Sequence, residues 1–154
     1  MDNTIKLLYV DDEENNLMSF KATFRMEYQV FIAKNAAEGR LILDTEKDIG
    51  VIISDQRMPQ ESGVEFFVSI LDVYPNAVRI LLTGYTDIQA LIDAVNRGHI
   101  YRYLQKPWKA DELRYVINQG YELYKLRVDN QRLTNELKKV NNQLEFLYRQ
   151  TLLT

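Results

Sequence analysis

The sequence predicts an α/β fold in which a doubly wound parallel sheet carries helices on both faces. Five short, mostly apolar runs are each followed by a segment with apolar residues at helical spacing. The runs lack the period-two alternation of half-exposed strands and are too short for helices, so they fit strands buried on both faces. Strands that alternate with helices in this way build parallel sheets.

The central strand is predicted over residues 51–54, where an uninterrupted apolar and β-branched run ends in Asp55. The other strands are predicted over residues 5–10, 28–33, 77–82 and 101–104. Right-handed crossovers between parallel strands leave few topologies for five such units.

Helices are predicted over residues 15–26, after Asn35, over 64–74, over 87–96 and from 111 onward. Asn35 is the predicted N-cap of the second helix, because its side chain can accept a hydrogen bond from a free amide of the first turn. That helix is expected to bury Ala36, Leu41 and Leu43. In the helix over 87–96, the residues expected to face the core are Ile88, Leu91, Ile92 and Val95.

The composition limits the classes of function. With 154 residues, of which 46% are hydrophobic, the chain can bury one core and carry a small appendage. It has no cysteine, which excludes disulfides and thiolate chemistry. A net charge of -3 gives no reason to expect direct nucleic-acid binding. No apolar run is long enough to span a membrane, and the polar N-terminus does not resemble a signal peptide, so we expect a cytoplasmic protein.

Polar groups follow four of the predicted strands at the point where each strand ends. They are Asp11 and Asp12, Asp55, Thr83, and Lys106. Parallel strands place their carboxyl ends at one edge of the sheet, which is where ligands bind in open α/β folds. Clustered carboxylates suit a hard divalent cation, and we expect Mg²⁺, for which Mn²⁺ could substitute.

A carboxylate beside a metal ion, a lysine and a hydroxyl can receive a phosphoryl group. Asp55 would be the nucleophile, Mg²⁺ and Lys106 would neutralise the phosphoryl oxygens, and Thr83 would donate a hydrogen bond to one of them. Each feature alone has a plainer explanation, such as a turn or a helix cap. Four of them in register at strand ends favour the functional interpretation.

These motifs resemble the receiver domain of bacterial two-component response regulators, over about residues 4–122. The matching segments are Val10-Asp11-Asp12, Ser54-Asp55-Gln56-Arg57-Met58-Pro59 with Gly63, Leu82-Thr83-Gly84, and Tyr103-Leu104-Gln105-Lys106-Pro107. The resemblance implies a flavodoxin-like (βα)5 fold with strand order 2-1-3-4-5. It also implies that Asp55 accepts a phosphoryl group from a sensor histidine kinase or a phosphotransfer protein, and that the domain is a regulatory phosphoacceptor and not an enzyme with a turnover of its own.

The resemblance also assigns roles to individual residues. Asp12, Asp55 and the backbone carbonyl of Arg57 would bind the metal directly, and Asp11 would act largely through water. Thr83 and Tyr103 would be the switch residues, Thr83 moving toward the phosphoryl group and Tyr103 swinging inward behind it. A cis bond before Pro107 would help to aim Lys106.

The last helix is expected to continue as a coiled coil, because residues 111–153 contain no proline and one glycine. A heptad repeat places a narrow apolar stripe, here called the seam, at positions a and d. The seam consists of Leu123, Leu126, Asn130, Leu133, Leu137, Val140, Leu144 and Leu147. Asn130 at an a position favours a parallel two-stranded coil, so we expect a homodimer. The predicted domains are therefore residues 1–122 and a dimerisation or linker helix over 123–154, leading to an effector domain outside this chain.

Two other classes of function stay open. In one, the coil is the function and the acidic pocket is never phosphorylated. In the other, the protein is a phosphohydrolase with an aspartyl-phosphate intermediate, although haloacid dehalogenase-like enzymes need a second acid where this chain has Arg57. The segment 100–108 is similar to receivers joined to cyclic-dinucleotide phosphodiesterases, protein phosphatases, cyclases or kinases, which is an analogy at the level of the family.

Overall fold

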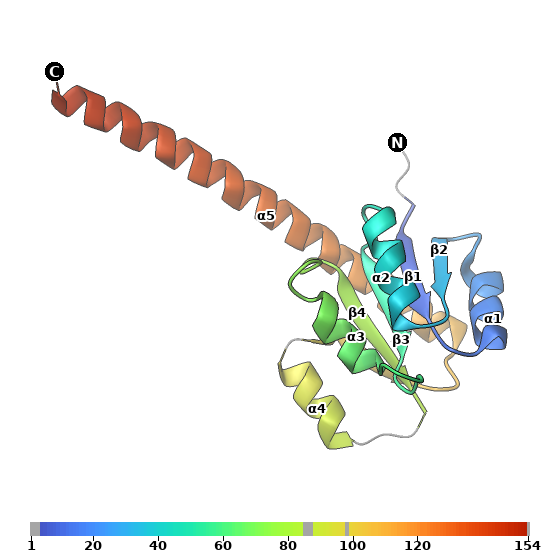
Figure 1. Cartoon of the computed structure of the whole chain (residues 1–154). Helices are drawn as coiled ribbons and strands as arrows, with labels where there is room; N and C mark the ends of the chain where they lie inside the picture. The colour runs from blue at the N-terminus through green and yellow to red at the C-terminus, as the bar shows by residue number, and fades with distance from the viewer. Residues whose placement is uncertain (1–3, 85–87, 98, 154) are drawn as a thin grey trace. The chain divides into compact units, whose positions relative to one another are not determined.

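The computed structural model describes residues 4–84, 88–97 and 99–153, and these form five β-α units in succession (Figure 1). The strands are β1 Lys6–Val10, β2 Gln29–Ala33, β3 Val51–Asp55, β4 Val78–Thr83 and β5 Arg102–Gln105. The helices are α1 Glu14–Phe24, α2 Ala36–Thr45, α3 Gly63–Ile70, α4 Ile88–Asn96 and α5 Ala110–Leu153.

The described strands form one parallel sheet in the order β2-β1-β3-β4-β5. The predicted fold class and strand order are therefore confirmed. The sheet is doubly wound, with β3 at its centre, and the register pairs Val10 with Ser54 and Thr83 with Gln105. The polar groups that follow these strands consequently meet at one edge.

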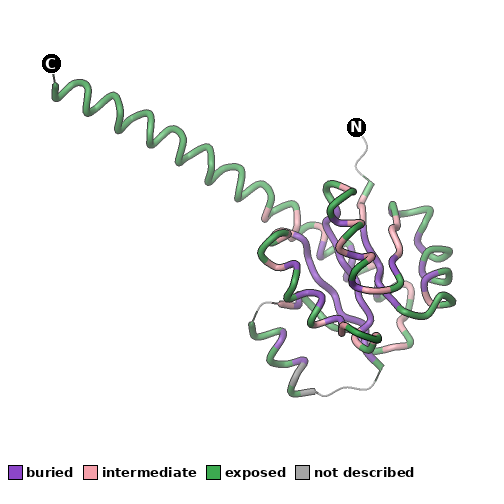
Figure 2. Tube along the Cα trace, in the orientation of Figure 1, coloured by how far each residue is buried: buried purple, intermediate pink, exposed green. Residues whose placement is uncertain are grey.

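The core of the described residues lies on the two faces of the sheet, along the buried strands (Figure 2). One cluster joins the sheet to α2, α3 and α4 through residues such as Leu43, Phe66 and Leu91. The other joins it to α1 and α5 through residues such as Phe20 and Val116. Alternate residues of each central strand supply both clusters, which is why these strands are apolar throughout.

Side chains cap two of the helices as their sequences indicate. The Asn35 side chain accepts a hydrogen bond from the Glu38 amide at 2.8 Å, so the predicted N-cap of α2 is confirmed. In α3, Ser62 and Glu65 form a capping box, in which each side chain accepts a hydrogen bond from the other residue's amide. This capped start fixes where the loop after β3 ends.

Two predictions of helix orientation are wrong. Leu41 in α2 is 66% exposed, and Gly39 takes the core position between Ala36 and Leu43 because a larger residue would meet Phe66. In α4, Leu91 is buried as predicted, but Ile92 and Val95 are exposed. Ala94 faces the core instead, while the side chain of Ile88 lies outside the described residues.

The chain divides by its contacts into two units, Met1–Tyr124 and Lys125–Thr154, and α5 contributes to both. Within the first unit, α5 packs closely on the sheet, since Gly120 lies against Val78 and Tyr124 lies over Gly50. The second unit consists of the exposed continuation of this helix (Figure 2). Within the described residues, no helix is both long enough and apolar enough to cross a membrane.

Candidate functional site

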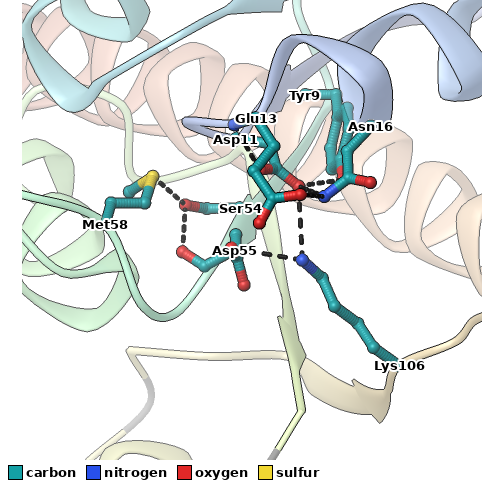
Figure 3. A network of polar contacts seen from close by, with 8 residues as sticks. All are labelled: Tyr9, Asp11, Glu13, Asn16, Ser54, Asp55, Met58 and Lys106. Atoms are coloured by element: carbon teal, nitrogen blue, oxygen red, sulfur yellow. Dashed lines mark hydrogen bonds and ion pairs between the residues drawn. The ribbon is translucent and has the colours of Figure 1, made fainter.

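The predicted acidic pocket forms at the carboxyl edge of the sheet, where Asp11, Asp55 and Lys106 converge from the ends of β1, β3 and β5 (Figure 3). The Nζ atom of Lys106 lies 3.3 Å from Oδ2 of Asp11 and 3.2 Å from Oδ2 of Asp55. One ammonium group is therefore shared between two carboxylates that are 95 and 51 residues away in the sequence. The strand-end argument correctly predicted that these residues come together.

Asp55 ends β3 and is only 8% exposed. Burial raises the pKa of its carboxyl group, the charge of Lys106 opposes this, and the charges of Asp11 and Asp12 add to the rise. For Lys106, burial alone would lower the pKa, but the carboxylates of Asp55 and Asp11 outweigh it and the net shift is upward. The lysine therefore stays protonated, and its charge is aimed at Asp55.

Asp11 has no exposed surface, and its carboxylate is held by protein donors. Its Oδ2 atom accepts hydrogen bonds from the Tyr9 hydroxyl at 2.6 Å, from the Asn16 amide at 3.1 Å and from Lys106. Its Oδ1 atom accepts one from the Glu13 amide at 3.0 Å. These contacts offset the cost of burying a carboxylate.

The sequence argument did not predict the parts played by Tyr9 and Asn16. A signal for Tyr9 exists, because a hydroxyl group in a fully buried strand needs a partner. Tyr9 and Asp11 are also two residues apart in an extended segment, so their side chains point to the same face. Burial and the hydrogen bond to Asp11 raise the pKa of Tyr9, so its hydroxyl remains a donor at neutral pH.

The donor set fits a hard divalent cation. Among the described residues, Asp11, Asp12 and Asp55 each offer an oxygen atom, and these atoms lie within 4.8 Å of one another. Asp12 is exposed at the edge of the sheet, whereas the other two carboxylates are buried. Three carboxylates beside one ammonium leave an excess of negative charge, and carboxylate oxygens with an open solvent side are what Mg²⁺ prefers.

The loop after β3 is anchored by Gln56. Its amide donates to the Leu82 carbonyl at 3.0 Å, its carbonyl accepts from the Gly63 amide at 3.0 Å, and its side chain accepts from the Val64 amide. Arg57 lies in this anchored loop, exposed and two residues after Asp55. The metal-binding role of its backbone carbonyl stays a prediction.

Thr83 is the last residue of β4 and is buried, and its carbonyl accepts a hydrogen bond from the Lys106 amide at 2.9 Å. Tyr103 in β5 is 41% exposed, so the structure contains the outward arrangement of this side chain. Its inward swing and the movement of Thr83 stay predictions. The Lys106–Pro107 peptide bond is cis, as the resemblance implied.

The predicted seam of α5 is exposed from Leu126 onward. Its apolar members Leu126, Leu133, Leu137, Val140, Leu144 and Leu147 are each at least half exposed. Leu123 is partly buried, and Asn130 is exposed. An apolar stripe of this length is unusual on the surface of a soluble monomer.

Comparison with known proteins identifies the family. The family model of the response regulator receiver domain matches residues 7–118. Hydrogenase transcriptional regulatory protein HoxA from Cupriavidus necator is 37% identical over 137 residues, which cover 89% of this chain and 28% of the relative. The chain thus spans little more than a quarter of the length of this curated relative.

Solved structures agree with this assignment. A crystal structure described as adenylate cyclase from Rhodopirellula baltica superposes with a TM-score of 0.82 at 28% identity, covering 86% of this chain and 98% of that one. The signal receiver domain of an HD domain-containing protein from Pseudomonas fluorescens superposes with a TM-score of 0.74 at 31% identity, covering 80% and 98%. Together with the geometry of the acidic pocket, these matches show that the chain belongs to the response regulator receiver domain family.

Proposed function

We propose that this chain is a phosphorylation-dependent signalling switch whose phosphoacceptor is Asp55. The observation that carries the proposal is the shared ammonium group of Lys106, 3.2 Å from Asp55 and 3.3 Å from Asp11. A lysine held in this way lies where negative charge develops on a phosphoryl group bound to Asp55. The donor would be a phosphohistidine of a sensor histidine kinase or of a phosphotransfer protein.

In the proposed transfer, an Oδ atom of Asp55 forms a bond to the phosphorus atom. The bond between that phosphorus and the imidazole nitrogen of the donor breaks, and its electron pair leaves with the imidazole. Lys106 would neutralise part of the phosphoryl charge, and Thr83, the last residue of β4, would donate a hydrogen bond to a phosphoryl oxygen. Mg²⁺ held by Asp12, Asp55 and the Arg57 carbonyl would supply further charge neutralisation when bound.

The output is proposed to pass through a homodimeric coil formed by the seam. A parallel pair places Asn130 opposite Asn130 of the second copy, where two amides can bond to each other. An antiparallel pair aligned over residues 123–147 would place Asn130 opposite Val140 and leave the amide unsatisfied. The parallel arrangement therefore leaves fewer polar groups without partners.

An effector beyond residue 154 completes the proposal. The HoxA relative is named a transcriptional regulator, whereas the two structural neighbours carry the names of an adenylate cyclase and an HD domain-containing protein. HoxA shares the higher identity with this chain, 37% against 28% and 31% for the two structural neighbours, so we favour a transcriptional effector. This chain itself would not contact nucleic acid, and we expect it to work in the cytoplasm.

Intact-mass spectrometry after incubation with Mg²⁺ and acetyl phosphate tests the switch. We expect the wild-type chain to gain one phosphoryl group and Asp55→Asn to gain none. The same experiment with a purified histidine kinase would identify a receiver that accepts only its own donor. A folded wild-type chain that stays unmodified with both kinds of donor would favour the scaffold function instead. Rapid release of inorganic phosphate in many turnovers would favour a phosphohydrolase.

A further inference from the structure

Tyr9 makes the shortest of the contacts that hold the Asp11 carboxylate (Figure 3). Its hydroxyl donates to Oδ2 at 2.6 Å, compared with 3.1 Å for Asn16 and 3.3 Å for Lys106. Both Tyr9 and Asp11 have no exposed surface, so water does not replace this contact easily. A hydrogen bond from a buried hydroxyl to a carboxylate is also stronger than one between neutral groups.

The other two side-chain donors to Asp11 are shared. Lys106 divides its ammonium group between Asp11 and Asp55, and Asn16 also donates to Glu13 at 3.3 Å. In the proposed transfer, the phosphoryl group on Asp55 competes with Asp11 for the ammonium group of Lys106. As Lys106 is drawn to the phosphoryl group, Asp11 keeps only its hydrogen bonds from Tyr9, Glu13 and Asn16 while it stays buried. A buried carboxylate that loses a charged donor depends more strongly on the donors that remain.

We propose that Tyr9 is a positioning residue for phosphoryl transfer, and this proposal rests on the function proposed above. Its hydroxyl keeps the Asp11 carboxylate oriented and hydrogen-bonded when Lys106 leaves it for the phosphoryl group. Lys106 can then move without leaving an unsatisfied buried charge behind. Tyr9 and Lys106 therefore substitute for each other as donors to Asp11.

The aromatic packing around Tyr9 suits this role. Its ring stacks on Phe20 with centroids 4.2 Å apart and an interplanar angle of 21°. Phe20 in turn meets the edge of Trp108 at 5.9 Å, and Trp108 lies two residues after Lys106. These contacts hold the Tyr9 ring in one place, so its hydroxyl is preorganised to face Asp11.

A double-mutant cycle in the absence of metal and phosphodonor tests whether Tyr9 and Lys106 can replace each other as hydrogen-bond donors to Asp11. Tyr9→Phe is compared in the wild-type and Lys106→Met backgrounds by urea unfolding in EDTA. We expect Tyr9→Phe to lower the urea midpoint in both, with a loss about 0.5 M larger in the Lys106→Met background. An equal or smaller loss in that background would overturn the proposal.

Tyr28→Phe is the matched control. The Tyr28 hydroxyl donates to Oδ1 of Asn118 at 2.8 Å, and its ring packs on Phe24 in the same aromatic cluster, away from the pocket. The substitution therefore removes the same group from the same cluster. We expect its effect on the urea midpoint to be equal in the two backgrounds.

The transfer itself is measured as the rate of phosphorylation by acetyl phosphate at saturating Mg²⁺, at a temperature where all variants are folded. We expect Tyr9→Phe to slow it about tenfold and Tyr28→Phe to leave it unchanged. A Tyr9→Phe rate equal to the wild-type rate would overturn the role of Tyr9. A wild-type chain that no donor phosphorylates would overturn the proposed function, whereas the unfolding cycle would still decide whether Tyr9 and Lys106 substitute for each other.

Discussion

The start of α3 packs directly against the end of β3, where Gly63 approaches the backbone of Asp55. A Cβ atom added to Gly63 would lie 2.5 Å from the backbone oxygen of Asp55 and 2.6 Å from Cδ1 of Leu81. Both distances are shorter than a normal contact between nonbonded atoms. The first helical residue of α3 therefore has to be glycine for the end of β3 and the start of the helix to pack together.

Gly63→Ala is expected to destabilise the chain by about 1–3 kcal/mol, because the added methyl group overpacks the end of β3 and displaces Asp55. Urea unfolding measures the loss, and the rate of phosphorylation by acetyl phosphate should fall with it. Gly84→Ala is the matched control for stability, since a Cβ atom there would meet no atom of the described residues within 4 Å. An equally stable Gly63→Ala chain would contradict the packing argument.

At the level of the elements, Arg40 of α2 is bonded to the loop between β3 and α3, which contains Arg57. The guanidinium group of Arg40 forms two hydrogen bonds of 2.7 Å to the carboxylate of Glu61, just before α3. It also bonds to Ser69 at 3.0 Å and lies over the Phe66 ring. Paired contacts of this kind fix the direction of both groups and are stronger than single ones.

Glu61→Gln is expected to lower the free energy of unfolding by about 1 kcal/mol at neutral pH. The hydrogen bond from Arg40 lowers the pKa of Glu61 from 4.5, partly against the effect of burial. A lowered pKa in the folded state stabilises the fold above pH 4.5, and this stabilisation is lost as the pH falls through the lowered value. The difference between wild type and variant should therefore shrink in acid.

Urea unfolding at a series of pH values measures this difference. Asp129→Asn is a control, because Asp129 pairs with Arg132 at 3.7 Å between exposed side chains and such pairs contribute little. A difference for Glu61→Gln that stays constant between neutral pH and pH 3 would show that the ionised pair is not its cause.

A substitution in the seam of α5 tests whether the seam is the dimer interface. Leu137 and Leu152 are exposed to similar degrees, 70% and 67%, but only Leu137 lies in the seam. Leu137→Asn should weaken the homodimer by about tenfold or more, because it removes an a-position side chain that the dimer would bury, and Leu152→Asn should not. Light scattering coupled to size-exclusion chromatography measures the dimer. Equal dimerisation of both variants would exclude the seam as the interface.

In the whole molecule, Mg²⁺ binding at the acidic pocket should be linked to folding. The carboxylates of Asp11, Asp12 and Asp55 come together only in the folded chain, so Mg²⁺ should bind the folded state in preference. At about 100 times its dissociation constant, Mg²⁺ should raise the free energy of unfolding by about 2.7 kcal/mol. Thermal unfolding with Mg²⁺ and with EDTA checks this, and Asp12→Asn should remove most of the shift. A wild-type chain without any shift would argue against the site.

Phosphorylation and dimerisation should also be coupled. If phosphorylated Asp55 changes the dimer dissociation constant, dimerisation must change the phosphorylation equilibrium by the same factor. Typical couplings are about 5–150-fold. Sedimentation of the wild-type chain with and without acetyl phosphate measures the factor, and Asp55→Asn should show none. An unchanged dissociation constant in the phosphorylated wild type would mean that the signal leaves by another route.

Much of the fold and of the pocket could be predicted from the sequence. The apolar runs that end in Asp11, Asp55, Thr83 and Lys106 indicated a parallel sheet, and parallel strands bring their ends to one edge. The salt bridges of Lys106 were therefore foreseeable, although one spans 95 residues. The family resemblance added the strand order and the cis bond before Pro107, and both are found.

Other features were decided by tertiary packing. Leu41, Ile92 and Val95 fit a helical stripe in the sequence but are exposed, because the sheet selects which part of an amphipathic face it covers. Small residues fill the closest approaches instead, as Gly39 does beneath Phe66. Hydrophobic periodicity is a local property, so it predicts that a segment is a helix and leaves its rotation on the sheet undetermined.

The reactive residues of the pocket could be predicted from the sequence, whereas the residues that support them could not. The residue types at the strand ends, which determine the chemistry, are local and could be read directly from the sequence. The donors that stabilise the buried Asp11 carboxylate, Tyr9 and Asn16, depend on which groups are buried together. Burial arises from the packed chain as a whole, and a buried charge needs whichever donors that packing supplies.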